Sequence, residues 1–145
     1  LMTDDLLEET LLPVPDGYEQ MNWSRGFGRQ IGPLYERRGE GKAYTRAFRV
    51  EEHHTNGMGN CHGGMLMAFC DGLLATAVHR ETRQGAVTVR VTSDFLSAAK
   101  AGEWLEGTAR VTKVLEDMVF CSGEAKVGDS LVIKVSGVFK VLKKR

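Results

Sequence analysis

Cysteine is scarce in this chain, with three copies among 145 residues. Cys61, Cys70 and Cys121 are odd in number and widely spaced, which argues against a disulfide framework. The N-terminal residues also lack a basic region followed by an apolar stretch, the pattern of a secretion signal. We therefore expect free thiols and a reducing, cytoplasmic setting.

An excess of charge of one sign and long apolar runs are missing as well. The 19 basic and 19 acidic side chains balance to a formal net charge of zero, which attracts neither nucleic acid nor a membrane surface. No apolar segment reaches the ~18 residues that a membrane span needs. We expect a chain that binds neither of these partners, and its length fits one ordinary domain.

Two parts are predicted along the chain, an N-terminal arm over residues 1–30 and one domain over residues 31–145. The arm has room for one short helix before the first of its prolines, Pro13. Residues 31–38 and 42–50 predict two strands joined by a glycine-rich turn. A hairpin therefore opens the domain.

A long helix is predicted after an irregular loop over residues 51–61, with Asn60 near the helix N-cap. It runs from His62 to about Arg80, roughly 19 residues and about 28 Å. Because it is apolar on nearly every side, we expect protein all around it. Small residues recur every four positions along it and predict a ridge that another backbone element approaches closely: Gly64, Ala68, Gly72 and Thr76.

After Gly85 the apolar period changes to two, which predicts strands. Val87, Val89 and Val91 form one apolar row, and three more alternating segments follow, the last two joined by Gly128-Asp129. We expect these four strands to form a meander. The predicted fold class is α+β, one antiparallel sheet curled around one long central helix.

Asp71 is a single carboxylate inside the predicted apolar helix. Burying a charge costs several kcal/mol unless another group pairs with it or uses it. Two interpretations are open at this point. Asp71 is either a structural residue that caps a loop or pairs with Arg80 or Arg83, or it is a general base or nucleophile.

The start of the same helix offers a second feature. The N–H groups of Gly63 and Gly64 lie in the first turn, where they are unpaired and suit a developing oxyanion, although two glycines also simply permit a tight turn. His62 and Asp71 are nine positions apart, so they point to opposite sides and lie roughly 13 Å apart along the axis. They cannot act together within one chain unless the helix end bends sharply, so a partner from a second subunit is expected.

These residues carry a family resemblance. Asn56, six residues before His62-Gly63-Gly64, and Asp71, nine residues after His62, resemble the hotdog-fold acyl-CoA thioesterases of the phenylacetic acid degradation (PaaI-like) type. The resemblance runs from about residue 31 to residue 141. It implies hydrolysis of acyl-CoA to a carboxylate and free coenzyme A, with no cofactor beyond the coenzyme A of the substrate.

The resemblance also implies roles. Asp71 activates water or attacks the thioester carbonyl, the Gly63 N–H binds the thioester oxygen, and Asn56 orients the nucleophile or substrate. Thr88 stands where a hydroxyl assists, and the site forms between subunits of a homodimer or homotetramer. We expect a catalytic set of Asp71, Gly63, Asn56, His62 and Thr88, and a substrate-binding set of Gly64, Met67, Phe95 and Lys100.

Three competing interpretations remain. A metal site of His53, His54, Cys61 and His62 matches no common zinc spacing, so no metal is expected. A hydratase or dehydratase of the same fold would use His62 with an acidic partner. A non-catalytic acyl-CoA binding module would have no need of Asp71. The sequence does not indicate which acyl group is bound.

Overall fold

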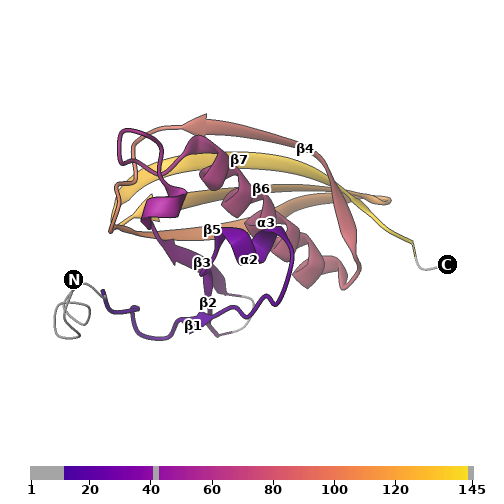
Figure 1. Ribbon diagram of the computed structural model, residues 1–145. Helices are drawn as coiled ribbons and strands as arrows, with labels where there is room; N and C mark the ends of the chain where they lie inside the picture. Colours follow the sequence, from indigo (N-terminus) through magenta and orange to yellow (C-terminus); the bar gives the residue numbers. More distant parts are fainter. Residues whose placement is uncertain (1–11, 41–42, 144–145) are drawn as a thin grey trace, which may run out of the picture.

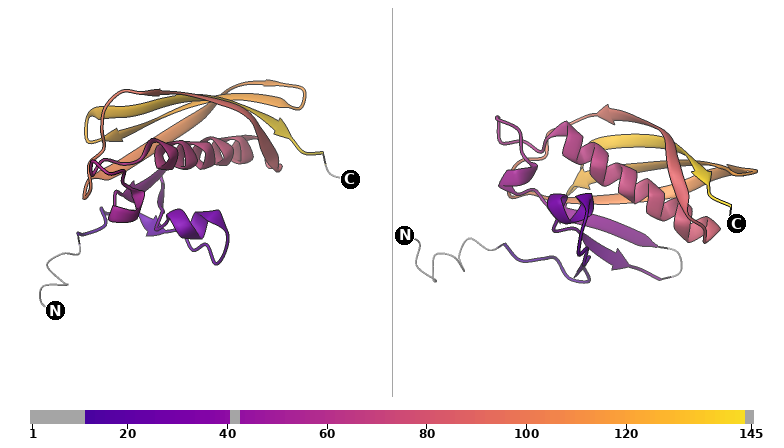
Figure 2. Two further views of the ribbon diagram at one scale, coloured as in Figure 1. Left: turned by 45° about the horizontal axis from the view of Figure 1, so that its top comes forward. Right: turned by 45° about the vertical axis from the view of Figure 1, so that its right-hand side comes forward.

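The computed structural model describes residues 12–40 and 43–143, which form one antiparallel sheet packed on one long helix (Figure 1). The seven strands follow the order β1-β2-β3-β5-β6-β7-β4. Figure 2 shows the sheet curving over one side of the helix, α3. The predicted α+β class and central helix are confirmed. In the described part of the chain, no helix is long and apolar enough to cross a membrane.

The elements after the arm are β2 (Tyr35–Arg38), β3 (Tyr44–Arg49), the short helix η1 (Glu52–His54), α3 (Gly63–Thr82), β4 (Ala86–Phe95), β5 (Trp104–Leu115), β6 (Met118–Val127) and β7 (Ser130–Val141). Their buried apolar side chains form one core between the sheet and α3. On the helix these are Met65, Leu66, Phe69, Cys70, Leu73, Leu74 and Val78.

The N-terminal arm contributes β1 (Glu19–Gln20), which pairs with β2, and α2 (Phe27–Ile31). Figure 2 shows α2 below α3, on the side away from the main sheet. The predicted hairpin is confirmed by the pairing of β2 with β3. Its first strand begins at Tyr35 rather than at residue 31, because Pro33 has no N–H to donate to a ladder. The arm's predicted helix before Pro13 and the turn residue Gly41 lie outside the described residues.

The N-cap of α3 is His62, and Asn60, predicted to lie near the cap, stands two residues before it. The ring Nδ1 of His62 accepts a hydrogen bond from the Gly64 N–H at 2.7 Å, which satisfies one donor of the first turn. Asn60 instead pairs with Lys100 in an isolated bridge. The helix ends at Thr82, two residues later than predicted, where Arg83 adopts a left-handed conformation with φ of 58°.

The predicted four-strand meander was wrong at β4. Strands β5, β6 and β7 do follow one another, but β4 pairs with β7 at one edge of the sheet and β5 pairs with β3. The central place of β5 depends on Gly107, where an added Cβ would lie 2.8 Å from Phe69 and Leu73 of α3. A larger residue there would hold the helix away from the sheet.

The valine row predicted for β4 was also wrong, because the strand contains a bulge. Thr88 pairs with Phe139 and Arg90 with Val138, which leaves Val89 as an extra residue. Val89 is 55% exposed, and the hydroxyl of Thr88 reaches the carboxylate of Asp71 on α3. The bulge shifts the alternation before Arg90 by one residue, so Thr88 faces the helix in place of Val87 and Val89, while Val91 keeps the predicted side.

The small-residue ridge of α3 meets a side chain rather than a backbone element at Gly72, which corrects the prediction. An added Cβ at Gly72 would lie 2.9 Å from Nη1 of Arg46, a residue of β3 that is 5% exposed. Arg46 donates hydrogen bonds to Thr76 Oγ1 at 2.6 Å and to the Tyr44 hydroxyl at 3.3 Å. Glycine at position 72 thus makes room for a buried guanidinium.

Candidate functional site

Three contacts join α3 to β4, and we refer to them together as the seam. Thr88 Oγ1 donates to Asp71, Ser93 Oγ donates to the thioether sulfur of Met67, and the Phe95 ring lies beside Gly63. Gly63, Met67 and Asp71 stand at four-residue spacing, so they share one face of the helix. The helix and the strand run in opposite directions (Figure 1).

Asp71 lies at one end of the seam and is half-buried. Its Oδ1 accepts a hydrogen bond from Thr88 Oγ1 at 2.7 Å. Because an ionised carboxylate accepts at both oxygens, this bond orients the group and leaves acceptor capacity for water or substrate. Arg80, an alternative partner expected from the sequence, lies instead over the Tyr44 ring, with its Cζ 5.0 Å from the ring centroid.

Gly63 begins α3 at the other end of the seam. An added Cβ at this residue would lie 3.5 Å from the Phe95 ring, so the backbone and the ring are close together. The Gly64 N–H is not free, contrary to expectation, since it donates to His62 Nδ1. Of the two glycine amides, that of Gly63 is the donor suited to a ligand at the positive end of the helix. The bond from Gly64 makes Nδ1 of His62 an acceptor, so His62 closes the helix end.

Asn56 holds the shape of the loop before α3. Its Oδ1 accepts from the N–H of Met58 at 2.9 Å and from that of Asn60 at 3.3 Å. The amide nitrogen of the same side chain is therefore the part of Asn56 that can donate to a substrate. Lys100 lies beside this loop, because its backbone bridges Asn60, and its side chain is exposed.

The two ends of the seam are too far apart to act on one atom within a single chain. Gly63 and Asp71 are eight residues apart, which places them about 12 Å apart along the helix axis. The sequence predicted both an axial separation, roughly 13 Å between His62 and Asp71, and side chains on opposite sides of the helix. In the structure both Gly63 and Asp71 contact β4, so their separation is along the axis.

β4 is an edge strand and carries large exposed apolar side chains. Val87 is 46% exposed and Phe95 53%, and Leu96 directly after the strand is 53% exposed. An edge strand presents a row of backbone donors and acceptors that another strand can pair with. Both ends of the seam therefore lie against a surface suited to pairing.

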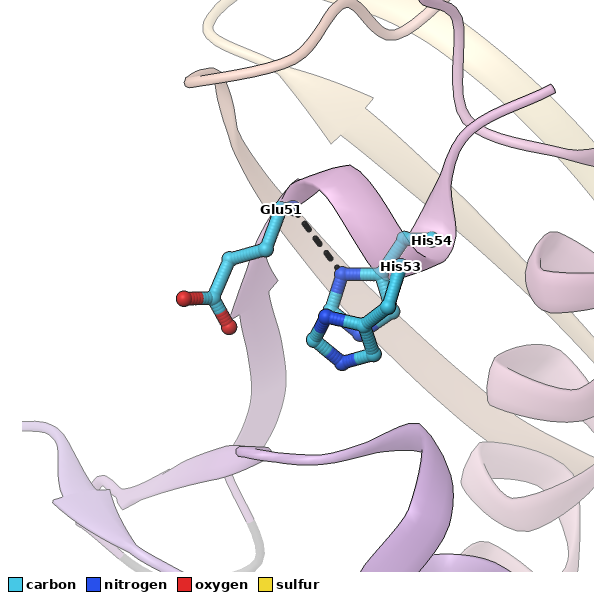
Figure 3. A group of neighbouring side chains, drawn as sticks. All are labelled: Glu51, His53 and His54. Atoms are coloured by element: carbon cyan, nitrogen blue, oxygen red, sulfur yellow. Dashed lines mark hydrogen bonds between the residues drawn. The ribbon is translucent and has the colours of Figure 1, made fainter. Parts of the chain in front are cut away.

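Figure 3 shows a group that resembles a metal site, formed by Glu51, His53 and His54. One potential ligand atom of each lies within 4.8 Å of the others. Both ring nitrogens of His54 are engaged, however: Nδ1 accepts from the Glu51 N–H at 3.0 Å and Nε2 donates to the Ile31 carbonyl at 2.6 Å. His53 Nε2 likewise donates to the Gly32 carbonyl at 2.6 Å. The donor set thus fits a brace between η1 and the arm rather than a metal.

The three cysteines are free and buried. Burial raises the pKa of the Cys70 thiol to about 12 and the pKa of Cys61 and Cys121 to about 11. Thiols with such pKa values stay protonated at neutral pH and are poor nucleophiles. The cysteines are therefore poor candidates for a nucleophile, and Asp71 stays the candidate base of the seam.

Ser93 and Arg46 were missed by the sequence reasoning. Ser93 lies on the helix-facing side of β4 because it alternates in phase with Val91, and this phase was the available signal. Arg46 and Phe48 are two residues apart on β3, so they lie on the same side of the strand. A charged residue on the same side as a core phenylalanine was the signal that could have identified Arg46.

Comparisons with known proteins agree with this architecture. Residues 58–134 match the model of the thioesterase superfamily. A Pseudomonas aeruginosa protein named as an esterase is 37% identical over 131 residues, covering 89% of this chain and 98% of that protein. Human acyl-coenzyme A thioesterase 13 is 33% identical over 105 residues, covering 70% of this chain and 74% of that protein.

Solved structures give the same result. Zebrafish thioesterase superfamily member 2 superposes with a TM-score of 0.74 at 26% identity, covering 82% of this chain and 88% of that one. The Escherichia coli PaaI protein from the phenylacetic acid degradation operon gives a TM-score of 0.65 at 26% identity, covering 69% and 72%. The chain therefore belongs to the thioesterase superfamily, a family of thioester hydrolases, and is a hotdog-fold member of the PaaI-like type.

Proposed function

We propose that this protein hydrolyses acyl-CoA thioesters to a carboxylate and free coenzyme A, at sites formed between two copies of the chain. The name of the human relative supports the substrate class. The observation that carries the arrangement is the seam, with a carboxylate and its hydroxyl partner at one end and a helix-terminal glycine amide at the other.

Pairing of two β4 edges would join the separated halves of the site. When two copies of one strand pair antiparallel about a two-fold axis, the start of each lies beside the end of the other. Asp71 and Thr88 lie near the start of β4, while Gly63 and Phe95 lie near its end. Asp71 of one copy would then approach Gly63 of the second, and each pair would contain two equivalent sites.

The reaction follows from these groups. Asp71, oriented by Thr88, accepts a proton from a water molecule whose oxygen attacks the thioester carbon. The negative charge that develops on the carbonyl oxygen is stabilised by the Gly63 N–H at the helix terminus. The carbon–sulfur bond then breaks, and the thiolate of coenzyme A takes the proton from Asp71. A direct attack by Asp71 would instead form an anhydride, which water hydrolyses to the same products.

Other roles follow from the same geometry. The amide nitrogen of Asn56 is available to donate to the substrate, and Phe95 and Met67 provide apolar surface along the seam. Lys100 is a candidate contact for the phosphates of coenzyme A. The hydratase alternative is weakened, because His62 Nδ1 is an acceptor in the helix cap. Cytoplasmic location and assembly as a dimer or tetramer remain predictions.

Complementation between two inactive variants tests the shared site. Asp71→Asn removes the base, and Gly63→Pro removes the amide proton at the first helical position, where proline is tolerated. His62 before it already has φ of −61° and ψ of 138°, which a following proline accepts. Each variant alone should lose about 10²-fold or more in kcat, while Gly63→Ala, which keeps the N–H, should stay active.

The two variants are then mixed, unfolded and refolded together, and thiol release from an acyl-CoA panel is measured. A mixed pair contains one site in which Asp71 and Gly63 are both intact, so activity should return. Activity that stays lost although mixed pairs form would show that each site lies within one chain. No thiol release by the parent protein on any acyl-CoA would reject the proposed hydrolysis and favour a binding module.

A further inference from the structure

We infer that the contact between Met67 and Ser93 limits the length of the acyl group, so that short acyl chains are preferred. This inference rests on the proposed function and concerns the same seam. The thioester carbon would lie at Asp71, and the middle of the seam is closed by the bond from the Ser93 hydroxyl to the Met67 sulfur.

The apolar acyl group has a reason to follow the seam. Coenzyme A carries charged phosphates, whose burial is costly, so it belongs on the solvent side of the site. Between α3 and β4 the surface turns apolar, because Val91 and Met67 are partly buried and pack against the core. An acyl chain that lies along this surface is removed from water, and the hydrophobic effect therefore favours this direction over the opposite one.

Met67 stands across this path. It is four residues before Asp71, one helical turn, so its side chain is about 6 Å along the axis from the carboxylate. Its thioether contacts β4 through Ser93, so it spans the space between helix and strand. A short acyl group fits before this contact, whereas a longer one must displace Met67 from Ser93.

Truncation of Met67 tests the inference. Met67→Ala should raise the ratio of kcat/KM for octanoyl-CoA to that for butyryl-CoA by about 10-fold or more. The reason is that the additional methylenes of the octanoyl chain would occupy the space left by the Met67 side chain. Ser93→Ala removes the hydroxyl that contacts the Met67 thioether but keeps the thioether itself, so it should raise the ratio by less. Met67→Val, which keeps part of the volume, gives a milder change if the alanine variant folds poorly.

Met65→Ala is the matched control. Met65 is on the same helix and 7% exposed, but it belongs to the core and not to the seam. It should lower stability and leave the octanoyl-to-butyryl ratio unchanged.

An unchanged ratio in both folded Met67 variants, or an equal rise in Met65→Ala, would overturn the inference while leaving thioester hydrolysis intact. Failure of the parent protein to release thiol from any acyl-CoA would instead reject the proposed function itself. The two failures are therefore distinguishable.

Discussion

Asp71 and Gly72 are neighbours in the chain, yet they face different strands and different environments. On the Gly72 side, Arg46 is 5% exposed and donates to two hydroxyls, and the Tyr44 hydroxyl donates onward to Glu36 at 2.7 Å. On the Asp71 side, the carboxylate is half-buried and accepts one bond from Thr88.

The difference separates a structural polar cluster from the cluster that we propose for catalysis. A buried cation that donates to hydroxyl groups of two elements holds these elements together and is shielded from a substrate. A partly exposed anion with a single hydroxyl partner is oriented and keeps an oxygen for a reacting molecule. Both clusters lie against α3, so substitutions on the two sides of this helix should affect different properties.

The largest effect is expected at Asp71. Asp71→Asn keeps the shape of the side chain but removes the base, so kcat/KM for thiol release should fall by about 10² to 10⁴. The melting temperature, measured by circular dichroism, should change little because the group is only half-buried. Parental turnover in this variant would end the assignment of Asp71.

On the opposite side, Arg46→Met should act on stability. Loss of two hydrogen bonds from a charged donor lowers the free energy of unfolding by about 2–4 kcal/mol, measured by urea denaturation. The folded fraction should retain thiol release within a few-fold of the parent. A loss of turnover comparable to that of Asp71→Asn at unchanged stability would contradict the division into two sides.

Thr88→Val tests how much the hydroxyl contributes to the seam. It replaces the hydroxyl by a methyl group of similar size, so Asp71 loses its orienting bond and kcat should fall about 10-fold, the equivalent of one hydrogen bond. Thr88→Ser should restore the rate in the same assay. Equal rates in the valine and serine variants would mean that the bond to Asp71 does not serve the reaction.

Gly72→Ala is expected to cost about 1 kcal/mol of stability. Alanine gains about 1 kcal/mol of helix propensity, but its Cβ would lie 2.9 Å from Arg46 Nη1 and force the guanidinium to give up a bond worth more. In an Arg46→Met background the same change should become stabilising. Additive effects in this double-mutant cycle would rule out the contact.

The smallest effect concerns pH. Burial lowers the pKa of His54 below its usual 6.5, so the unfolded chain binds its proton more readily. His54 therefore contributes stability above pH 6.5 that is lost as the pH falls from 6.5 through the lowered pKa. The slope of unfolding free energy against pH in this window should flatten in His54→Gln, and an unchanged slope would assign the acid sensitivity to other groups.

Periodicity predicted the parts of the molecule that follow one regular pattern. The long apolar helix and the hairpin before it were evident, because each rests on residues close in sequence. The spacing of Asn56, His62, Gly63 and Asp71 likewise pointed to the candidate site. The order of the strands was not predictable in this way, because the pairing of β4 with β7 joins residues 38 to 55 positions apart.

Two local features also escaped prediction for physical reasons. The cap by His62 depends on a ring nitrogen that competes with the usual capping residue Asn60, and the choice depends on where the loop runs. The Arg46 contact combines a glycine on a helix with a charge on a distant strand. Neither partner indicates the other until the fold brings them together.

The extra residue in β4 determines which side chains of the strand reach the candidate site. Val89 has no partner of its own in the ladder with β7, and because the ladder skips it, Thr88 rather than Val87 faces the helix. If Val89 instead paired with Phe139, it would take the place of Thr88 beside Asp71 and Thr88 would turn toward solvent, whereas deletion of Val89 would leave Thr88 opposite Phe139. The contact between Thr88 and Asp71 thus depends on where the ladder skips a residue as well as on residue type, so deletion of Val89 should straighten the strand and still keep the hydroxyl contact.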